Sequence, residues 1–350
     1  MIESKTILVT GGTGSFGKRF VREIVEKHRV QKLIIFSRDE LKQQQMRSVY
    51  PETEDSPIRY FIGDVRDKER LYRALQGVDI LVHAAALKQV PTAEYNPMEA
   101  IKTNVFGSAN VIDAAIDSGV GRIILLSSDK AVNPINLYGA TKLCAEKLFI
   151  AARSYVGSKD IRFSVVRYGN VVGSRGSVVP TFLSKSSSGV IPITDPRMTR
   201  FWITLDQGVS FVLKCINLMK GGETFIPKIP SMKVVDLAAA LAPGCRHEVI
   251  GIRPGEKLHE VLISEEDAPR TAEYDEFFVI YPYPRENEAN NATIYGERLV
   301  PESFRYSSDA NSLWLSHQDL VQMVHSTLDS QEIGGNLSVN SQQTNAVKKN

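Results

Sequence analysis

The sequence has only three cysteines in 350 residues, and Cys144, Cys215 and Cys245 lie far apart. An odd number of distant cysteines without a Cys-x-x-Cys pair excludes a disulfide framework and favours a reducing, cytoplasmic setting. None of the six histidines stands at ligand spacing from another. The sequence therefore predicts no metal site.

Long apolar runs are also missing. No segment approaches the roughly 20 apolar residues that a membrane-spanning helix needs, and residues 6–9 are too few for the apolar part of a secretion signal. The formal net charge is only +2, which gives no electrostatic reason to expect a nucleic acid or a membrane as partner. With 43% hydrophobic and 23% charged residues, the composition is that of a globular protein with one large or two moderate domains.

The N-terminus carries a phosphate-binding pattern. An apolar strand, Thr6–Thr10, runs into the sequence GGTGSFG and then a helix to about residue 28. Glycines at this spacing permit a tight turn, close approach of a pyrophosphate and close packing of the helix, whose N-terminus faces the phosphates. The pattern predicts dinucleotide binding by Gly11, Thr13, Gly14, Ser15, Phe16 and Gly17.

The end of the second predicted strand, residues 32–36, bears on the choice of cofactor. Ser37, Arg38, Asp39 and Lys42 follow it. An acid here typically binds the ribose 2′-hydroxyl of NAD, whereas an arginine accommodates the 2′-phosphate of NADP. We expect NADP, held by Arg38; the alternative is NAD held by Asp39 beside a surface arginine.

Two further strands, residues 58–62 and 79–83, end in segments suited to the rest of a dinucleotide. The first leads to Gly63-Asp64-Val65, and the second to three alanines whose small side chains let a nicotinamide approach the backbone. The predicted contacts are Asp64, Val65, Ala84, Ala85, Ala86 and Lys88. A long helix over residues 97–119 carries Asn104, for which an ordered water and a simple core hydrogen bond are both open.

The stretch SSDKAVNPINLYGATK, residues 127–142, gathers reactive side chains at one strand end. Ser128, Asp129 and Lys130 follow the apolar strand 122–126, where open α/β sheets place their ligands. Tyr138 and Lys142 lie four residues apart and so share one face of the helix predicted over 137–153. We expect the Lys142 cation to lower the pKa of Tyr138.

Alternating strands and helices predict a doubly wound parallel sheet over residues 1–170, to which later segments return. Residues 171–285 are predicted to form mainly a smaller, mixed α/β substrate domain, followed by a C-terminal segment, 286–330, and a disordered tail, 331–350. Arg200 and Arg253 are the residues expected on a substrate diphosphate.

TGGTGSFG, GDVRD, Tyr138-x-x-x-Lys142 and RYGNV together resemble the extended short-chain dehydrogenase/reductases that act on nucleotide sugars. SRDELKQ, AAALKQVPTAEYNP, GSRGSVVP, ITDPRMTRFWI and IRPGEKLHE are similar to the inverting UDP-N-acetylglucosamine 4,6-dehydratases of pseudaminic acid biosynthesis. The resemblance covers about residues 5–285. Retaining dehydratases have Asp-Glu where this chain has Asp129-Lys130, and a related capsule branch has methionine at Tyr138.

The resemblance implies a Rossmann-type fold, NADP regenerated in each turnover, UDP-N-acetylglucosamine as substrate and a homo-oligomer, either dimer or hexamer. It implies that Tyr138 removes the O4 proton, Lys142 holds the ribose and Ser128 steadies O4. A neutral Lys130, its pKa lowered by burial and Lys142, would take the C5 proton while Asp129 protonates O6. Further implied contacts are Asn170 and Val171 for the cofactor, and Lys88, Asn170, Val178, Arg200, Arg253 and Glu256 for the substrate.

Three alternatives stay open. A UDP-sugar 4-epimerase and a retaining 4,6-dehydratase share the family's fold and cofactor. A catalytically inactive dinucleotide sensor would share the fold too, but it has less need of the intact tyrosine–lysine pair and the Asp129-Lys130 doublet.

Overall fold

The computed structural model describes residues 2–174, 178–283 and 298–332. Residues 333–350 of the predicted tail, residues 286–297 of the predicted C-terminal segment and residues 175–177 of the GSRGSVVP motif lie outside these ranges.

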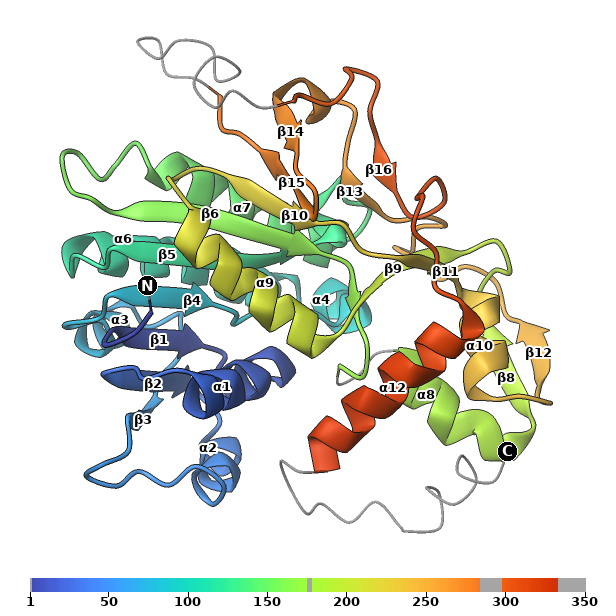
Figure 1. Cartoon of the computed structure of the whole chain (residues 1–350), viewed down its shortest axis with the longest axis horizontal. Helices are drawn as coiled ribbons and strands as arrows, with labels where there is room; N and C mark the ends of the chain where they lie inside the picture. The colour runs from blue at the N-terminus through green and yellow to red at the C-terminus, as the bar shows by residue number, and fades with distance from the viewer. Residues whose placement is uncertain (1, 175–177, 284–297, 333–350) are drawn as a thin grey trace.

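One large sheet organises the described chain (Figure 1), with strand order β14-β15-β10-β6-β5-β4-β1-β2-β3. Neighbouring strands from β10 to β3 run parallel, whereas β15 and β14 add an antiparallel edge. The strands are β1 (Thr6–Thr10), β2 (Lys32–Ser37), β3 (Ile58–Ile62), β4 (Ile80–His83), β5 (Arg122–Ser128), β6 (Arg162–Tyr168), β10 (Thr224–Pro227), β14 (Thr271–Glu273) and β15 (Phe277–Ile280).

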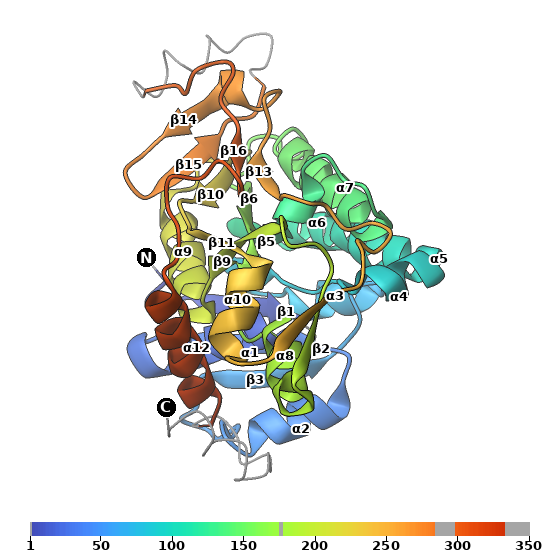
Figure 2. The ribbon, with the colours of Figure 1, turned by 90° about the vertical axis from the view of Figure 1, so that its right-hand side faces the viewer.

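Helices cover both faces of the sheet, as the two views show (Figures 1 and 2). Alternate residues of β1 point to opposite sides: Ile7 and Val9 pack in the core that includes α1 and α9, while Leu8 packs in the core that includes α3, α6 and α7. The helices are α1 (Ser15–Lys27), α9 (Leu205–Leu218), α3 (Lys68–Ala74), α6 (Gly107–Asp117) and α7 (Leu137–Ala152). The predicted doubly wound parallel fold is confirmed.

The long helix predicted over residues 97–119 is wrong in one respect. A π-helical turn, Lys102–Phe106, interrupts it between α5 (Pro97–Ile101) and α6. The turn places Asn104 against the loop after β4: its amide accepts from Leu87 N and donates to Leu87 O, at 2.8 and 2.9 Å, and it donates to Thr141 Oγ1 at 2.9 Å. Of the two readings for Asn104, the structure favours the core hydrogen bond. Two short helices, α2 (Glu40–Arg47) and α4 (Val90–Tyr95), flank the same half of the molecule.

A second lobe stands beside the carboxyl ends of the strands (Figure 1). Its separate core contains Trp202, Leu237 and, from the C-terminal helix, Leu320 and Val324. The helix at 317–332 thus completes this lobe; residues 317–330 were expected in a separate C-terminal segment and residues 331–332 in the disordered tail. Its elements are β7 (Asn170–Val171), α8 (Val178–Lys185), β8 (Val190–Ile193), β9 (Thr199–Ile203), β11 (Ser231–Lys233), α10 (Val234–Leu241), β12 (Arg246–Val249) and α12 (His317–Glu332), and β13 (Val261–Ile263) pairs with β16 (Tyr306–Ser307) nearby.

Candidate active site

The glycine loop after β1 is packed too tightly for larger side chains. Gly11 has φ +64°, and a Cβ there would lie 3.0 Å from the Ala85 backbone. A Cβ on Gly17 would lie 2.4 Å from Gly12 O, so α1 starts directly against the loop. This is the close approach that a pyrophosphate-binding turn requires. The segments of the predicted cofactor residues 11–17 and Ala84–Ala86 therefore lie together, with Ala84 N and Ala85 N each donating to Thr10 Oγ1 at 3.2 Å.

At the end of β2, the acid of the predicted cofactor pair already has partners. Asp39 caps α2 by accepting from Lys42 N at 2.9 Å, and its other oxygen pairs with the Lys42 ammonium. Arg38 is half-exposed and lies 3.5 Å from Asp64 Oδ2. Ser37 accepts a hydrogen bond from Gln43 at 3.0 Å. The carboxylate that would bind a ribose diol is thus engaged, and the guanidinium is accessible.

Asp64, predicted to hold an adenine, is mainly bonded to Arg66. Its two oxygens accept from Arg66 N at 3.0 Å and from Arg66 Nε and Nη2 at 3.0 and 2.8 Å. Burial alone would raise the pKa of Asp64, but these bonds lower it. The carboxylate is therefore ionised and fixed in place, with Val65 buried next to it.

The end of β5 and the start of α7 are locked together. Asp129–Ala131 forms a 3₁₀ turn, and a Cβ on Gly139 would lie 2.2 Å from Lys130 O. Asn136 caps α7 through Gly139 N at 2.7 Å and donates to Gly255 O at 2.7 Å. The predicted stretch is thus held between the sheet and the loop at residues 251–257, and Ser128, Asp129, Lys130 and Tyr138 converge.

Asp129 and Lys130 form a buried ion pair. Asp129 is fully buried, and its Oδ1 accepts from Ser128 Oγ at 2.7 Å and from Lys130 Nζ at 3.0 Å. Its Oδ2 is buried, and none of the described residues forms a hydrogen bond with it. An orphaned buried acceptor costs about 1–3 kcal/mol, so this oxygen is suited to receive a donor from a ligand.

The structure corrects the expected electrostatics of Lys130. Burial alone would lower the pKa of Lys130, but the carboxylates of Asp129 and Glu260 outweigh burial and raise it. The charges that act on this pKa are those of Asp129, Glu260 and Arg200, while Lys142 Nζ turns to Leu126 O, 2.6 Å away. In the free protein Lys130 is therefore an ammonium, not the neutral amine that was expected.

Tyr138 and Lys142 differ from expectation in the same way. Burial raises the pKa of Tyr138 to about 12, and the cation that opposes this rise is Lys130 rather than Lys142, with a further contribution from the Ser128 hydroxyl. Burial lowers the pKa of Lys142 to about 8, against the opposing pull of Glu146. Tyr138 and Lys142 share the site, but the cation that lowers the pKa of Tyr138 is Lys130 and not, as expected, Lys142.

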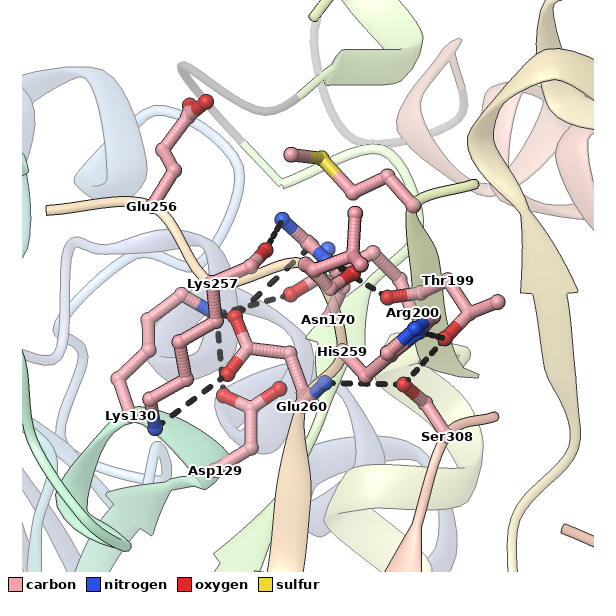
Figure 3. Close-up of polar contacts among 12 residues, drawn as sticks. Asp129, Lys130, Asn170, Thr199, Arg200, Glu256, Lys257, His259, Glu260 and Ser308 are labelled. Atoms are coloured by element: carbon pink, nitrogen blue, oxygen red, sulfur yellow. Dashed lines mark hydrogen bonds and ion pairs between the residues drawn. The ribbon is translucent and has the colours of Figure 1, made fainter. Parts of the chain in front are cut away.

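Glu260 is a site residue that the sequence reasoning missed (Figure 3). This buried carboxylate lies 3.5 Å from Lys130 Nζ, 3.8 Å from Lys257 Nζ and 3.8 Å from Arg200 Nε. It belongs to the segment GEKLHE, residues 255–260, in which the sequence analysis predicts Glu256 as the substrate contact. The side chain of Glu256 points away from the cluster and lies 3.7 Å from Arg253. Glu256 and Glu260 are four residues apart, but this spacing could not predict a shared site, because the segment forms a loop and not a helix.

The other predicted substrate residues differ in how exposed their side chains are. The Arg200 guanidinium is buried and donates to Thr199 O, Leu258 O and Lys257 O at 2.6, 3.1 and 2.9 Å. The guanidinium of Arg200 thus supports this loop, and its contact with a substrate diphosphate stays a prediction. Arg253 is exposed, and Asn170 Oδ1 accepts from Lys130 Nζ at 3.1 Å. Lys88 is exposed before α4, and Val178 begins α8.

Over the described ranges, no group of three or more metal-ligating side chains comes together. In the same part of the chain, no helix has both the length and the apolar character required to span a membrane.

Comparisons with known proteins agree with this geometry. The family model for polysaccharide biosynthesis proteins matches residues 7–282. An inverting UDP-N-acetylglucosamine 4,6-dehydratase of Campylobacter jejuni subsp. jejuni serotype O:2 is 55% identical over 335 residues, which cover 93% of this chain and 99% of the relative. A UDP-glucose 4-epimerase of Rickettsia prowazekii is 41% identical over 319 residues, 88% of this chain and 92% of the relative.

A solved structure, Pen from Bacillus thuringiensis, superposes with a TM-score of 0.83 at 35% identity and covers 95% of this chain and 99% of its own. Family and fold thus agree over nearly the whole described chain. The chain belongs to the polysaccharide biosynthesis protein family of enzymes, within the extended short-chain dehydrogenase/reductases.

Proposed function

We propose that this protein is a C5-inverting UDP-N-acetylglucosamine 4,6-dehydratase. Its product would be UDP-2-acetamido-2,6-dideoxy-β-L-arabino-hex-4-ulose, the first intermediate of pseudaminic acid biosynthesis. The observation that carries the proposal is the buried Asp129–Lys130 pair beside Tyr138, with an amine in place of a second acid. The 55% identity to a relative of that activity supports it.

The site fits a nicotinamide dinucleotide, and we propose NADP. The turn at Gly11 and Gly17 leaves room for backbone alone, which suits a pyrophosphate. Arg38 would hold the 2′-phosphate, since the Asp39 carboxylate is occupied by Lys42. When bound, the nicotinamide supplies hydride chemistry, taking a hydride from C4 of the sugar and returning one to C6.

Tyr138, as a phenolate that has passed its own proton to solvent, would accept the proton of the C4 hydroxyl, and Ser128 would steady O4. When hydride returns to C6, C5 would take a proton on the opposite face from Tyr138 or from water. The phenol is neutral in the free protein because burial raises its pKa. The Lys130 ammonium is the cation that favours the phenolate here, so the proton on Lys130 and the proton on Tyr138 are coupled. Lys142, anchored on Leu126 O, would reach the cofactor ribose.

Asp129 and Lys130 would share one proton. Transfer from Lys130 Nζ to Asp129 Oδ1, 3.0 Å apart, converts the ion pair into a neutral amine and a carboxylic acid. The amine then takes the C5 proton, and the acid gives its proton to the departing O6 hydroxyl, which leaves as water. The same contact returns the proton from Lys130 to Asp129 for the next turnover. One desolvated contact thus supplies both base and acid.

The test is NMR of the product formed from UDP-N-acetylglucosamine in deuterated water. We expect a 4-keto-6-deoxy sugar with the L configuration and solvent deuterium at C5. The 41% identity to an epimerase makes 4-epimerisation the second candidate. An epimer that keeps its C6 hydroxyl and its C5 proton would contradict dehydration, and deuterium at C5 with the D configuration would contradict inversion alone.

A further inference from the structure

Glu260 lies beside the Lys130 ammonium, next to the carboxylate of Asp129 (Figure 3). It is 3% exposed, and its buried Oε2 has no hydrogen-bond partner among the residues that the structure describes. Its backbone N–H donates to Ser308 Oγ at 2.9 Å, and Ser308 is bonded in turn to Thr199 Oγ1 at 2.7 Å. A carboxylate buried at this depth needs compensating charge, and three cations supply it.

We propose that Glu260 is a positioning residue which sets how tightly the Lys130–Asp129 pair holds its shared proton, and hence the pH range in which the C5 proton exchanges. This inference rests on the proposed function, since it takes Lys130 and Asp129 to be the base and the acid.

The two carboxylates beside Lys130 have unequal surroundings. Glu260 faces Lys130, Lys257 and Arg200 at 3.5, 3.8 and 3.8 Å, whereas Asp129 forms an ion pair with Lys130 alone among the described residues. More positive charge around a carboxyl favours its ionised form. Asp129 Oδ1 is also the nearer acceptor, 3.0 Å from Lys130 Nζ against 3.5 Å for Glu260, so a proton that leaves Lys130 goes to Asp129. This asymmetry assigns the acid.

Charged and neutral groups both face Lys130. Asp129 and Glu260 carry negative charge, and Arg200 and Lys257 carry positive charge, while Tyr138 is a neutral phenol and Asn170 a neutral acceptor. His259, next in the chain to Glu260, is bonded to Thr199 Oγ1 at 2.8 Å on the far side. Removing the charge of Glu260 leaves the pair in a more positive field, which weakens its hold on protons.

The experiment measures C5 proton exchange against pH in full-length protein with bound cofactor and UDP-N-acetylglucosamine. In Glu260→Gln we expect both limbs of the pH profile to move to lower pH by about one unit. Glu265→Gln, the same substitution at an exposed glutamate five residues later, should keep the wild-type profile. A Glu260→Gln profile that superposes on wild type, whatever its height, would overturn the proposal.

Lys257→Gln supplies the opposite change. Lys257 Nζ is held by Val132 O at 2.5 Å and faces Glu260, so its loss should move the profile to higher pH. If Glu260→Gln fails to fold, Lys257→Gln decides alone, and an unmoved profile or a shift to lower pH overturns the proposal. Failure of the proposed function looks different: Lys130→Ala would then leave C5 exchange intact.

Discussion

The cofactor half and the charged cluster are built in opposite ways. The predicted cofactor segments 11–17, 37–39, 64–65 and 84–86 each follow a parallel strand, and the glycine loop is backbone packed on backbone. The charged cluster joins Asp129 and Lys130 of the turn after β5 to Arg200 of β9, the loop at 257–260 and Ser308. Close backbone packing determines the shape of the cofactor site, whereas neighbouring charges determine the proton affinity of the charged cluster.

The two regions therefore respond differently to substitution. Adding atoms to the glycine loop changes packing and cofactor binding, whereas removing one charge from the cluster changes the protonation of every other member. The four predictions below test this contrast from the largest expected effect to the smallest.

Lys130→Ala should remove C5 exchange while sparing the cofactor half. A positioned general base contributes about 10²–10⁴-fold to rate, so C5 deuterium incorporation should fall by at least about 100-fold. NADP affinity, measured by calorimetry, should not change. Lys185→Ala, at the exposed end of α8, is the control, and near-native exchange in Lys130→Ala would remove the base assignment.

Lys142 offers a test through stability. Its folded-state pKa of about 8 lies below the ordinary lysine value of 10.5. The unfolded chain therefore binds more protons between these values, and wild-type stability rises with pH in that window. Below pH 8 the buried ammonium costs about 3 kcal/mol.

Lys142→Met should therefore gain on wild type at pH 7, and this gain should shrink by about 3 kcal/mol by pH 10.5. Urea unfolding of both proteins without cofactor measures the difference in the free energy of unfolding. Lys147→Met, on the exposed side of α7, should show no such trend. A constant difference for Lys142→Met would mean that its ammonium is not destabilised by burial.

Arg38→Ala separates the two cofactors. A charge-assisted hydrogen bond contributes about 1.5–3 kcal/mol, so NADP binding should weaken by about 10–100-fold while NAD binding changes little. Calorimetric titration of both cofactors measures this. Equal losses for NADP and NAD would contradict the assignment of Arg38 to the 2′-phosphate.

Two glycines form the smallest contrast. Gly17→Ala would bring a Cβ to 2.4 Å from Gly12 O, and overpacking of this kind costs about 1–3 kcal/mol. Gly208, inside α9, has no atom within 4 Å of a Cβ built there, so Gly208→Ala should stabilise by up to about 1 kcal/mol. Thermal unfolding compares them, and a loss in Gly208→Ala as large as in Gly17→Ala would refute the packing argument.

Local patterns were enough to predict the sheet and the first half of the site. Strands such as Thr6–Thr10 and Ile58–Ile62 have the predicted bounds, because apolar runs bounded by glycine and polar residues carry the signal within a few residues. Tyr138, Lys130 and Asp129 were found for the same reason: they follow one strand.

Long-range placement could not be predicted. Glu260 reaches the site because the loop before β13 crosses back over the 3₁₀ turn. Arg200 donates its hydrogen bonds to the carbonyls of Leu258 and Lys257 in the same loop. The pKa of Lys130 depends on both. A prediction that counted only burial and the nearest lysine in sequence therefore gave its shift the wrong sign.

The most direct test of the central claim is a crystal structure with NADP and UDP-N-acetylglucosamine bound. We expect Lys130 Nζ to lie within about 3–3.5 Å of C5 of the sugar. Asp129 Oδ2 should contact the C6 hydroxyl, and Glu260 should still face Lys130. A structure in which the Lys130 side chain turns to solvent, or in which another group stands at C5, would contradict it.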